Sequence, residues 1–220
     1  PTVAINASLA GVFKGALACN QINTVYGSLN GIEGIIDQNL VNLNELIKND
    51  DDLELVKLTP STILGSCRHK LPDIEKSPDT YENILDCFKK YDIGAFFYIG
   101  GNDSMDTVNK LSKYVKENDS DIKIIGIPKT IDNDLYCTDH TPGFGSAVKY
   151  LATTLQEIAR DSAVYDLKSV VIVEIMGRHA GWLAASSGVL HANGETAPHL
   201  IYLPEGEFSQ EKFLNDVNAQ

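Results

Sequence analysis

Two short polar segments hold the residues whose types and spacing could carry out chemistry. Residues 100–104 (GGNDS) follow the apolar run 95–99, and residues 128–134 (PKTIDND) follow the apolar run 124–127. Each run is typical of a buried strand, so both segments should lie at the carboxyl ends of strands, where open α/β sheets bind ligands. Glycines, aspartates, a lysine and a threonine suit a polyphosphate, a divalent metal and a reacting hydroxyl. This combination indicates phosphoryl transfer.

In the first segment, Gly100 and Gly101 would let the backbone approach phosphate oxygens at the N-terminus of the helix that follows. The alternative is a tight strand-to-helix turn, with Asp103 or Ser104 capping the helix. The carboxylates of Asp103 and Asp106 are possible Mg²⁺ ligands. Asp106 falls one turn into the expected helix and is better interpreted as a partner of the helix dipole.

The second segment is the stronger signal. A hydroxyl that accepts a phosphoryl group needs a carboxylate to take its proton. Asp132 and Asp134 are two residues apart and point the same way in an extended loop. Lys129 can neutralise phosphate charge, and Thr130 can hydrogen-bond a phosphate or sugar oxygen. The alternative is an Asx-rich turn without a ligand.

A third group follows the β-branched run 169–175, which predicts a central strand. Met176, Gly177 and Arg178 would lie where that strand meets a helix, and a guanidinium there can stabilise a transferring phosphoryl group. The neighbouring His179 is interpreted as structural.

Composition limits the partners. The net charge is -12 and the isoelectric point is about 4.7, which argues against nucleic acid or an anionic membrane as a partner. An anionic substrate must therefore be held by local cations. Residues 65–70 (GSCRHK) supply such a cluster, the alternative being a solvated loop. The acidic stretch 49–54 is interpreted as a solvated loop rather than as a metal site.

Cysteine usage and hydropathy indicate a cytoplasmic protein. The four cysteines are scattered with no C-x-x-C pair, as expected for reduced thiols. No apolar run has the length of a membrane span, and no secretory signal opens the chain, although Pro1 suggests that the native start lies upstream.

Helical and strand periodicities alternate along the chain. The fold class expected is α/β, with a mostly parallel sheet and helices on both faces, a Rossmann-like three-layer sandwich. Helices are predicted at 6–21, 79–91, 104–117, 143–160, 179–190 and 210–217, and strands at 24–26, 95–99, 124–127, 169–175 and 199–203.

The order of these motifs resembles the phosphofructokinase family over essentially the whole chain. The resemblance rests on Asn6, residues 65–68 (GSCR), 100–104 (GGNDS), 128–134 (PKTIDND) and 176–181 (MGRHAG). It implies an incomplete phosphofructokinase fold. Residues 1–203 would form the donor-binding α/β domain with the start of the sugar-phosphate site, and residues 204–220 the beginning of a second domain or a connection.

The resemblance also implies roles for individual residues. Asp132 would be the general base on the 1-hydroxyl of fructose 6-phosphate, flanked by Thr130 and Asp134. The sugar phosphate would be bound by Met176, Gly177 and Arg178, and Arg178 would also steady the transition state. Contact with the phosphoryl donor would come from Arg68, Gly101, Asn102, Asp103, Ser104 and Lys129.

Two positions indicate which donor is used. ATP-dependent members resemble GGDGS and PGTIDND, whereas this chain has Asp103 and Lys129 in place of the two glycines. A carboxylate at position 103 fills the space of an ATP α-phosphate and repels its charge, while Lys129 adds a cation for compact pyrophosphate. Pyrophosphate is therefore the expected donor. The family's metal-ligating aspartate is Asn102 here, so Mg²⁺ is expected at Asp103 or Asn102.

The resemblance begins after paired glycines that should precede Pro1 and stops before the second-domain elements that clamp the sugar phosphate. The chain is thus expected to be part of a longer enzyme or one of two chains, and the complete enzyme a homodimer or homotetramer. The alternatives are an ATP-dependent phosphofructokinase, a non-catalytic regulatory member that binds sugar phosphate, and a sugar-binding module. Sedoheptulose 7-phosphate is an alternative acceptor.

The donor assignment makes a direct prediction. Replacing both residues, Asp103→Gly with Lys129→Gly, should weaken the use of pyrophosphate and allow ATP to be used, because a repelling carboxylate and an attracting ammonium are both lost. Initial rates with each donor measure the effect, and an unchanged donor preference in the double variant would contradict the assignment.

Overall fold

The computed structural model describes residues 3–220. Pro1 lies outside the described residues, and with it the expectation that the native start is upstream of this residue. The chain forms two compact units, one up to Lys129 and one from Thr130 to Gln220. Within residues 3–220, every helix is too short or too polar to cross a membrane.

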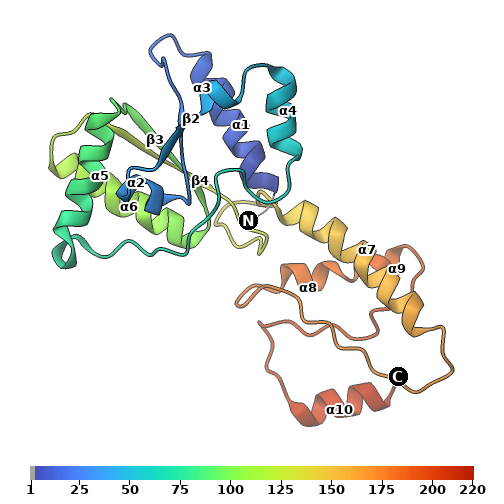
Figure 1. The fold of residues 1–220 in the computed structure, drawn as a ribbon. Coiled ribbons are helices and arrows are strands. Elements are labelled where there is room, and N and C mark those ends of the chain that lie inside the picture. Colours follow the sequence, from blue (N-terminus) through green and yellow to red (C-terminus); the bar gives the residue numbers. More distant parts are fainter. Residues whose placement is uncertain (1–2) are drawn as a thin grey trace. The chain divides into compact units, whose positions relative to one another are not determined.

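The first unit contains most of the regular structure (Figure 1). Its elements are α1 (Val3–Leu17), β1 (Tyr26–Ser28), α2 (Ile32–Ile36), β2 (Leu40–Asn42), α3 (Leu43–Leu46), α4 (Asp50–Leu58), the 3₁₀ turn η1 (Ile74–Lys76), α5 (Pro78–Lys90), β3 (Ala95–Gly100), α6 (Asn102–Glu117) and β4 (Lys123–Pro128). The second unit contains α7 (Phe144–Ser162), α8 (Trp182–Ser186), α9 (Val189–Ala192) and α10 (Gln210–Asn218).

The central feature of the first unit is the parallel pair formed by β3 and β4. Their register runs from Ala95 opposite Lys123 to Gly100 opposite Pro128. The two strands predicted at 95–99 and 124–127 are therefore confirmed, and they end side by side. A second, antiparallel pair joins β1 to β2.

Helices cover both faces of the β3–β4 pair, as Figure 1 shows. Successive strand side chains point to opposite faces. Phe96 and Tyr98 pack into the core formed with α5 and α6, whereas Ile99 joins the core of α1 and α4. The arrangement of helix, sheet and helix is the three-layer order expected from the sequence.

The α5–α6 side holds the larger core. The helix predicted at 79–91 is confirmed as α5, which begins with Pro78, a residue suited to the first turn. Its buried stripe of Tyr81, Ile84, Leu85 and Phe88 has helical spacing. Leu111 of α6 is fully buried in the same cluster.

The acidic stretch 49–54 is helical, so its interpretation as a loop was wrong. Asn49 caps α4 by accepting a hydrogen bond from the Asp52 amide at 2.9 Å, and the Asp52 carboxylate accepts one from the Lys48 amide at 2.9 Å. Carboxylates are stabilised in the first turn of a helix, where the dipole is positive. The acidic residues therefore start a helix.

The second unit corrects three expectations. The runs 169–175 and 199–203 carry no strand, and Val170 and Ile172 are exposed. An apolar run becomes a strand only beside a partner, and the structure gives these runs none among residues 3–220. The helix predicted at 179–190 is split into α8 and α9 at Gly188, after Ser187 turns its hydroxyl back to the Ala184 carbonyl at 2.6 Å.

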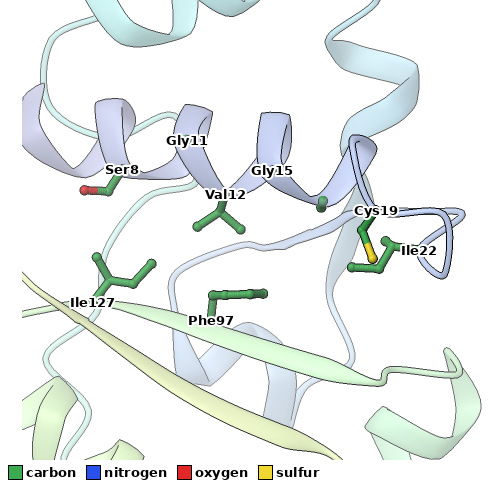
Figure 2. A pocket seen from close by; sticks show the side chains of 9 residues that line it. Ser8, Gly11, Val12, Gly15, Cys19, Ile22, Phe97 and Ile127 are labelled. Carbon is green, nitrogen blue, oxygen red and sulfur yellow. The ribbon is translucent and has the colours of Figure 1, made fainter.

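An apolar groove of about 540 Å³ runs between α1 and the sheet (Figure 2). Gly11 and Gly15 leave open space on the helix side, and Phe97 and Ile127 line the strand side. The groove has no charged lining residue, so it does not suit a phosphate. The candidate site lies elsewhere.

The α5–α6 core yields a stability prediction. Leu111→Ala should lower the free energy of unfolding by about 2–5 kcal/mol, because it leaves a cavity among fully buried side chains. Leu58→Ala on α4 is the control, since Leu58 is 74% exposed. Urea denaturation measures both, and equal small losses would place Leu111 outside the stabilising core.

Candidate active site

Within the first unit, the ends of β3 and β4 bring the glycines at 100–101 next to Lys129. The Lys129 amide donates a hydrogen bond to the Gly100 carbonyl at 2.7 Å. A Cβ atom on Gly101 would lie 3.7 Å from the Lys129 carbonyl oxygen. Lys129 and Gly101, the residue between β3 and α6, are thus direct neighbours, as the sequence predicted.

Gly100, the last residue of β3, and Gly101, the residue before α6, are glycines for different structural reasons. Gly100 is buried, and a Cβ atom on it would overlap the Ser104 hydroxyl. The turn interpretation therefore explains Gly100. Gly101 has room for a side chain, so packing alone does not require glycine at this position. Its small size leaves the start of α6 accessible.

Helix α6 begins at Asn102 with Gly101 as its N-cap, and no side chain caps it. The expected capping by Asp103 or Ser104 was wrong, because both lie inside the first turn. The uncapped N–H groups and the positive end of the dipole face an anion favourably. Asp106 lies beyond the first turn of α6 and pairs with Lys110 at 3.0 Å, so its interpretation as a partner of the helix dipole was wrong.

Three cations of the predicted site have no carboxylate partner among residues 3–220: Arg68, Lys129 and Arg178. Arg68 and Arg178 are exposed, and Lys129 is half-buried. Unpaired cations are notable in a chain of net charge -12. They remain available to an anionic ligand.

Glycine and asparagine shape the loop before Arg68. Gly65 has a positive φ of 75°, and a Cβ atom there would overlap the Asn30 amide oxygen. The backbone N–H of Asn30 donates a hydrogen bond to the Leu64 carbonyl at 2.7 Å. These contacts fix the start of the loop 65–70 against residues 30–31.

Asn102 and Asp103 offer oxygen atoms of the kind that Mg²⁺ binds. Both residues are exposed at the start of α6, and no hydrogen bond or ion pair within residues 3–220 engages the Asp103 carboxylate. The described residues contain no cluster of three or more His, Cys, Asp or Glu side chains arranged for a metal. Mg²⁺ typically uses one or two carboxylates with substrate phosphates and water, and this donor set fits that pattern.

In the second unit, buried Asn133 holds the loop that carries Asp132 and Asp134. Its side chain donates to the Asp139 carbonyl at 3.0 Å and accepts from the Thr141 amide at 2.9 Å. Its φ is +58°, in the left-handed region that asparagine tolerates better than most residues. The half-buried Asp132 lies beside it, while Asp134 is exposed.

Thr130 also shapes this loop. Its hydroxyl accepts a hydrogen bond from the Asp132 amide at 3.1 Å, and its carbonyl accepts one from the Thr141 hydroxyl at 2.7 Å. A threonine side chain, and not an aspartate, thus makes the contact across residues 130–132, and no hydrogen bond or ion pair within residues 3–220 engages the Asp132 carboxylate.

Gly177 makes the turn before Arg178. Its φ is +128°, and a Cβ atom would overlap the Ala180 carbonyl oxygen. Glu205, which the sequence analysis did not single out, accepts a hydrogen bond from the Gly181 amide at 2.7 Å. The available signal was an acidic residue two positions after the apolar run 199–203.

The predicted site residues therefore fall into two groups. Arg68, residues 101–104 and Lys129 belong to the first unit. Thr130, Asp132, Asp134 and residues 176–178 belong to the second. Within each group, hydrogen bonds and glycine turns hold the loops that carry these residues. The roles given to the single residues stay predictions.

Comparison with known proteins assigns the family. The family model described as Phosphofructokinase matches residues 1–220. The chain belongs to the phosphofructokinase family. The α/β class and the phosphofructokinase fold, present here in incomplete form, are thereby confirmed.

Several relatives share this fold and about two-fifths of the sequence. The pyrophosphate–fructose 6-phosphate 1-phosphotransferases of Rhodospirillum rubrum and Halomonas elongata are each 41% identical, over 99% and 95% of this chain. The crystal structure of a pyrophosphate-dependent phosphofructokinase from Marinobacter aquaeolei is 42% identical over 99% of this chain, with a TM-score of 0.85. The chain spans about half the length of these phosphofructokinases, at 52%, 50% and 54%.

The role of Asn133 can be tested. Asn133→Ala should loosen residues 130–141, since it removes two hydrogen bonds worth about 1 kcal/mol each. Amide hydrogen exchange should rise several-fold in this loop. Asn133→Gly removes the same bonds but keeps the positive φ accessible, so any smaller rise in exchange than in Asn133→Ala reflects relief of backbone strain. Asn109→Ala, at an exposed helical position, is the control, and unchanged exchange in both Asn133 variants would show that another contact holds the loop.

Proposed function

We propose that this chain is part of a phosphotransferase that moves a phosphoryl group from pyrophosphate to the 1-hydroxyl of fructose 6-phosphate. The products are fructose 1,6-bisphosphate and inorganic phosphate. The observation that carries this proposal is the pairing of Gly100 with Pro128, which sets an uncapped helix start beside Lys129. An uncapped helix start and an unpaired lysine together suit a compact, highly charged anion.

On the donor side, the backbone N–H groups at residues 102–104 and the Lys129 ammonium would hold pyrophosphate, with Arg68 as a further cation. Asp103 is exposed in the first turn of α6 and would narrow the space for a nucleoside attached to the phosphates. This supports pyrophosphate over ATP. The relatives at 41% identity, named for pyrophosphate, support the same donor.

On the acceptor side, Asp132 would take the proton of the sugar 1-hydroxyl as its oxygen forms a bond to phosphorus. The bond from that phosphorus to the bridging oxygen of pyrophosphate breaks, and the leaving phosphate takes away the electron pair. Met176, Gly177 and Arg178 would bind the sugar phosphate, with Asp134 and Thr130 beside the base. Arg178 would also stabilise charge on the transferring group.

A divalent metal is general for phosphotransferases of this kind, and Mg²⁺ is the ion that we propose. When bound, it neutralises the charge that develops on the pyrophosphate oxygens. Asp103, with Asn102 as a second oxygen ligand, would hold it. An amide oxygen binds the ion without adding negative charge, so Asp103 supplies the only carboxylate of the proposed pair.

The wider assignment follows from the same proposal. We take residues 1–203 as the donor-binding domain with the start of the sugar-phosphate site, and residues 204–220 as the start of a second domain or a connection. The complete enzyme would be a homodimer or homotetramer of the cytoplasm.

The decisive experiment compares phosphoryl donors on the full-length protein. Formation of fructose 1,6-bisphosphate should require fructose 6-phosphate, Mg²⁺ and pyrophosphate, and ATP should not replace pyrophosphate. Product formed only with ATP would move the chain to the ATP-dependent class. Binding of fructose 6-phosphate without turnover by either donor would identify a regulatory member, and sedoheptulose 7-phosphate as a second acceptor tests specificity.

The general base makes a further prediction. Asp132→Asn should lower kcat by roughly 10²–10⁴-fold, the usual contribution of a positioned base. The KM for pyrophosphate should change little, because the carboxylate acts on the sugar hydroxyl. Asp139→Asn is the matched control, since the Asp139 carbonyl, and not its carboxylate, bonds to Asn133. Steady-state kinetics decides, and a kcat near that of the unaltered enzyme would remove Asp132 from the chemistry.

A further inference from the structure

The Arg68 loop has no helix or strand of its own. Residues 65–73 contain no regular element between α4 and the turn η1. A loop of this length usually moves unless side chains tie it down. Several contacts do so here, including the hydrogen bond from the Tyr81 hydroxyl to the Pro72 carbonyl at 2.6 Å. Two further anchors lie on either side of Arg68, one just before it and one just after it.

The first anchor is the hydroxyl of Tyr98, on β3. It lies against the Cys67 and Ser104 side chains and the Ile32 backbone amide. A Cβ atom on Gly31 would lie 3.2 Å from both the Tyr98 oxygen and the Cys67 sulfur, and both side chains pack against the α5–α6 core. Burial, followed by the nearby Cys67, raises the pKa of Tyr98 to about 12, so the phenol stays protonated.

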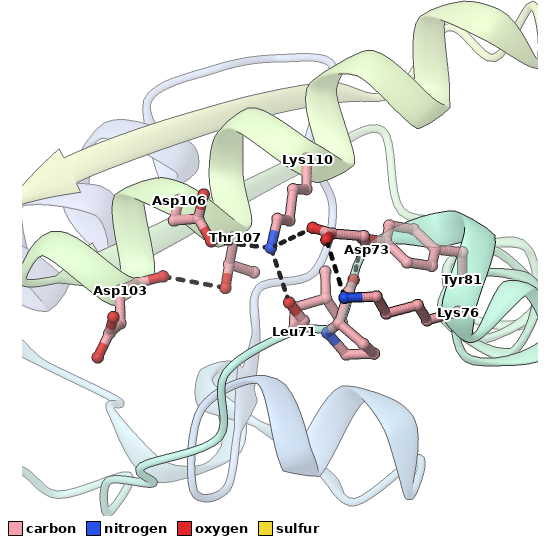
Figure 3. Close-up of polar contacts among 9 residues, drawn as sticks. Leu71, Asp73, Lys76, Tyr81, Asp103, Asp106, Thr107 and Lys110 are labelled. Atoms are coloured by element: carbon pink, nitrogen blue, oxygen red, sulfur yellow. Dashed lines mark hydrogen bonds and ion pairs between the residues drawn. The ribbon is translucent and has the colours of Figure 1, made fainter.

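The second anchor is Lys110, in the middle of α6 (Figure 3). Its ammonium donates to the Leu71 carbonyl at 2.9 Å and lies 3.0 Å from both Asp73 and Asp106. The Lys110 side chain is only 20% exposed. Its hydrogen bond and charge lower the pKa of Asp73, so the pair stays ionised at neutral pH.

The loop residues that the two anchors contact, Cys67 and Leu71, lie on either side of Arg68. Both anchors therefore connect the loop to β3 and the helix α6 that follows it. Tyr98 lies on β3, two residues before Gly100, and Lys110 lies on α6, which begins at Asn102. Ser104, in the first turn of α6, links the first anchor to the helix start, because it lies next to Tyr98 and fills the space beside Gly100. The Arg68 loop and the helix start are therefore held by one connected set of contacts.

We propose that Tyr98 and Lys110 are positioning residues that fix Arg68 relative to the N-terminus of α6. Neither would touch the substrate. Each would act through Arg68. The Arg68 guanidinium and the N–H groups of the α6 N-terminus could then bind one polyphosphate together, and the loop would lose little conformational entropy on binding. The consequence for the reaction rests on the proposed function, whereas the tethering of the loop does not.

The test uses two variants of the full-length protein that remove only the anchoring groups. Tyr98→Phe deletes one hydroxyl, and Lys110→Met keeps the aliphatic stem but deletes the ammonium. Amide hydrogen exchange at residues 66–71 should rise in both. The KM for pyrophosphate should rise about fivefold or more, the size of one lost hydrogen bond, while the KM for fructose 6-phosphate stays unchanged.

Matched controls separate positioning from general loss of stability. Tyr114→Phe makes the same chemical change at a tyrosine that packs edge-to-face on Tyr81 in the α5–α6 core. Lys89→Met removes a lysine whose ion pair with Asp86 is exposed. Neither control should alter exchange at residues 66–71 or the KM for pyrophosphate.

A double-variant cycle shows whether the effect passes through Arg68. In an Arg68→Ala background, Tyr98→Phe should no longer change the KM for pyrophosphate. An additive effect would overturn the positioning role, as would unchanged exchange at residues 66–71 in both anchor variants. Increased exchange in a protein that does not use pyrophosphate would instead support the tether and reject the proposed donor.

Discussion

The parallel pairing of β3 with β4 is the constraint on which the rest of the site depends. Its register sets Gly100 opposite Pro128, so the polar segments that follow the two strands start at one sheet edge. A slip of one residue would turn every strand side chain to the opposite face. Tyr98 would then leave the α6 side, where it contacts Ser104, and the loop before Arg68 would lose an anchor.

The loops around the candidate site keep their shape mainly through uncharged groups. Asn133 and Thr141 organise the loop that carries Asp132, and Gly65 and Gly177 make turns that a side chain would block. Backbone amides and carbonyls supply most of the bonds. Because neutral groups hold these loops in place, Arg68, Lys129 and Arg178 form no ion pair within residues 3–220. Lys110 is the exception, and its half-buried ammonium is already engaged by Leu71, Asp73 and Asp106.

The sequence predicted well wherever local pattern decides structure. The strands β3 and β4, and the helices α5, α6 and α7, follow from unbroken apolar runs and helical spacing. The runs 169–175 and 199–203 have equally strong strand character, yet pairing also needs a neighbour, and local pattern contains no information about one. The split of α8 from α9 depended on serine hydroxyls that turn back to the helix backbone.

The candidate site shows the same division. Motif spacing identified the residue types near the strand ends, and the register placed Lys129 beside Gly101. The supporting contacts could not be predicted, because they join residues far apart in the sequence, such as Tyr98 with Cys67 or Gly181 with Glu205. Asp106 illustrates why spacing alone is ambiguous, since its carboxylate is taken by Lys110 one helical turn away.

The extended run between α7 and α8 has a practical consequence. Val170, Val171 and Ile172 display their side chains to solvent, next to backbone groups that no strand pairs within residues 3–220. Such β-branched stretches with an open edge readily recruit identical chains. Expressed on its own, this length of polypeptide would therefore tend to precipitate, and a charged substitution at Val171 is the simplest remedy during purification.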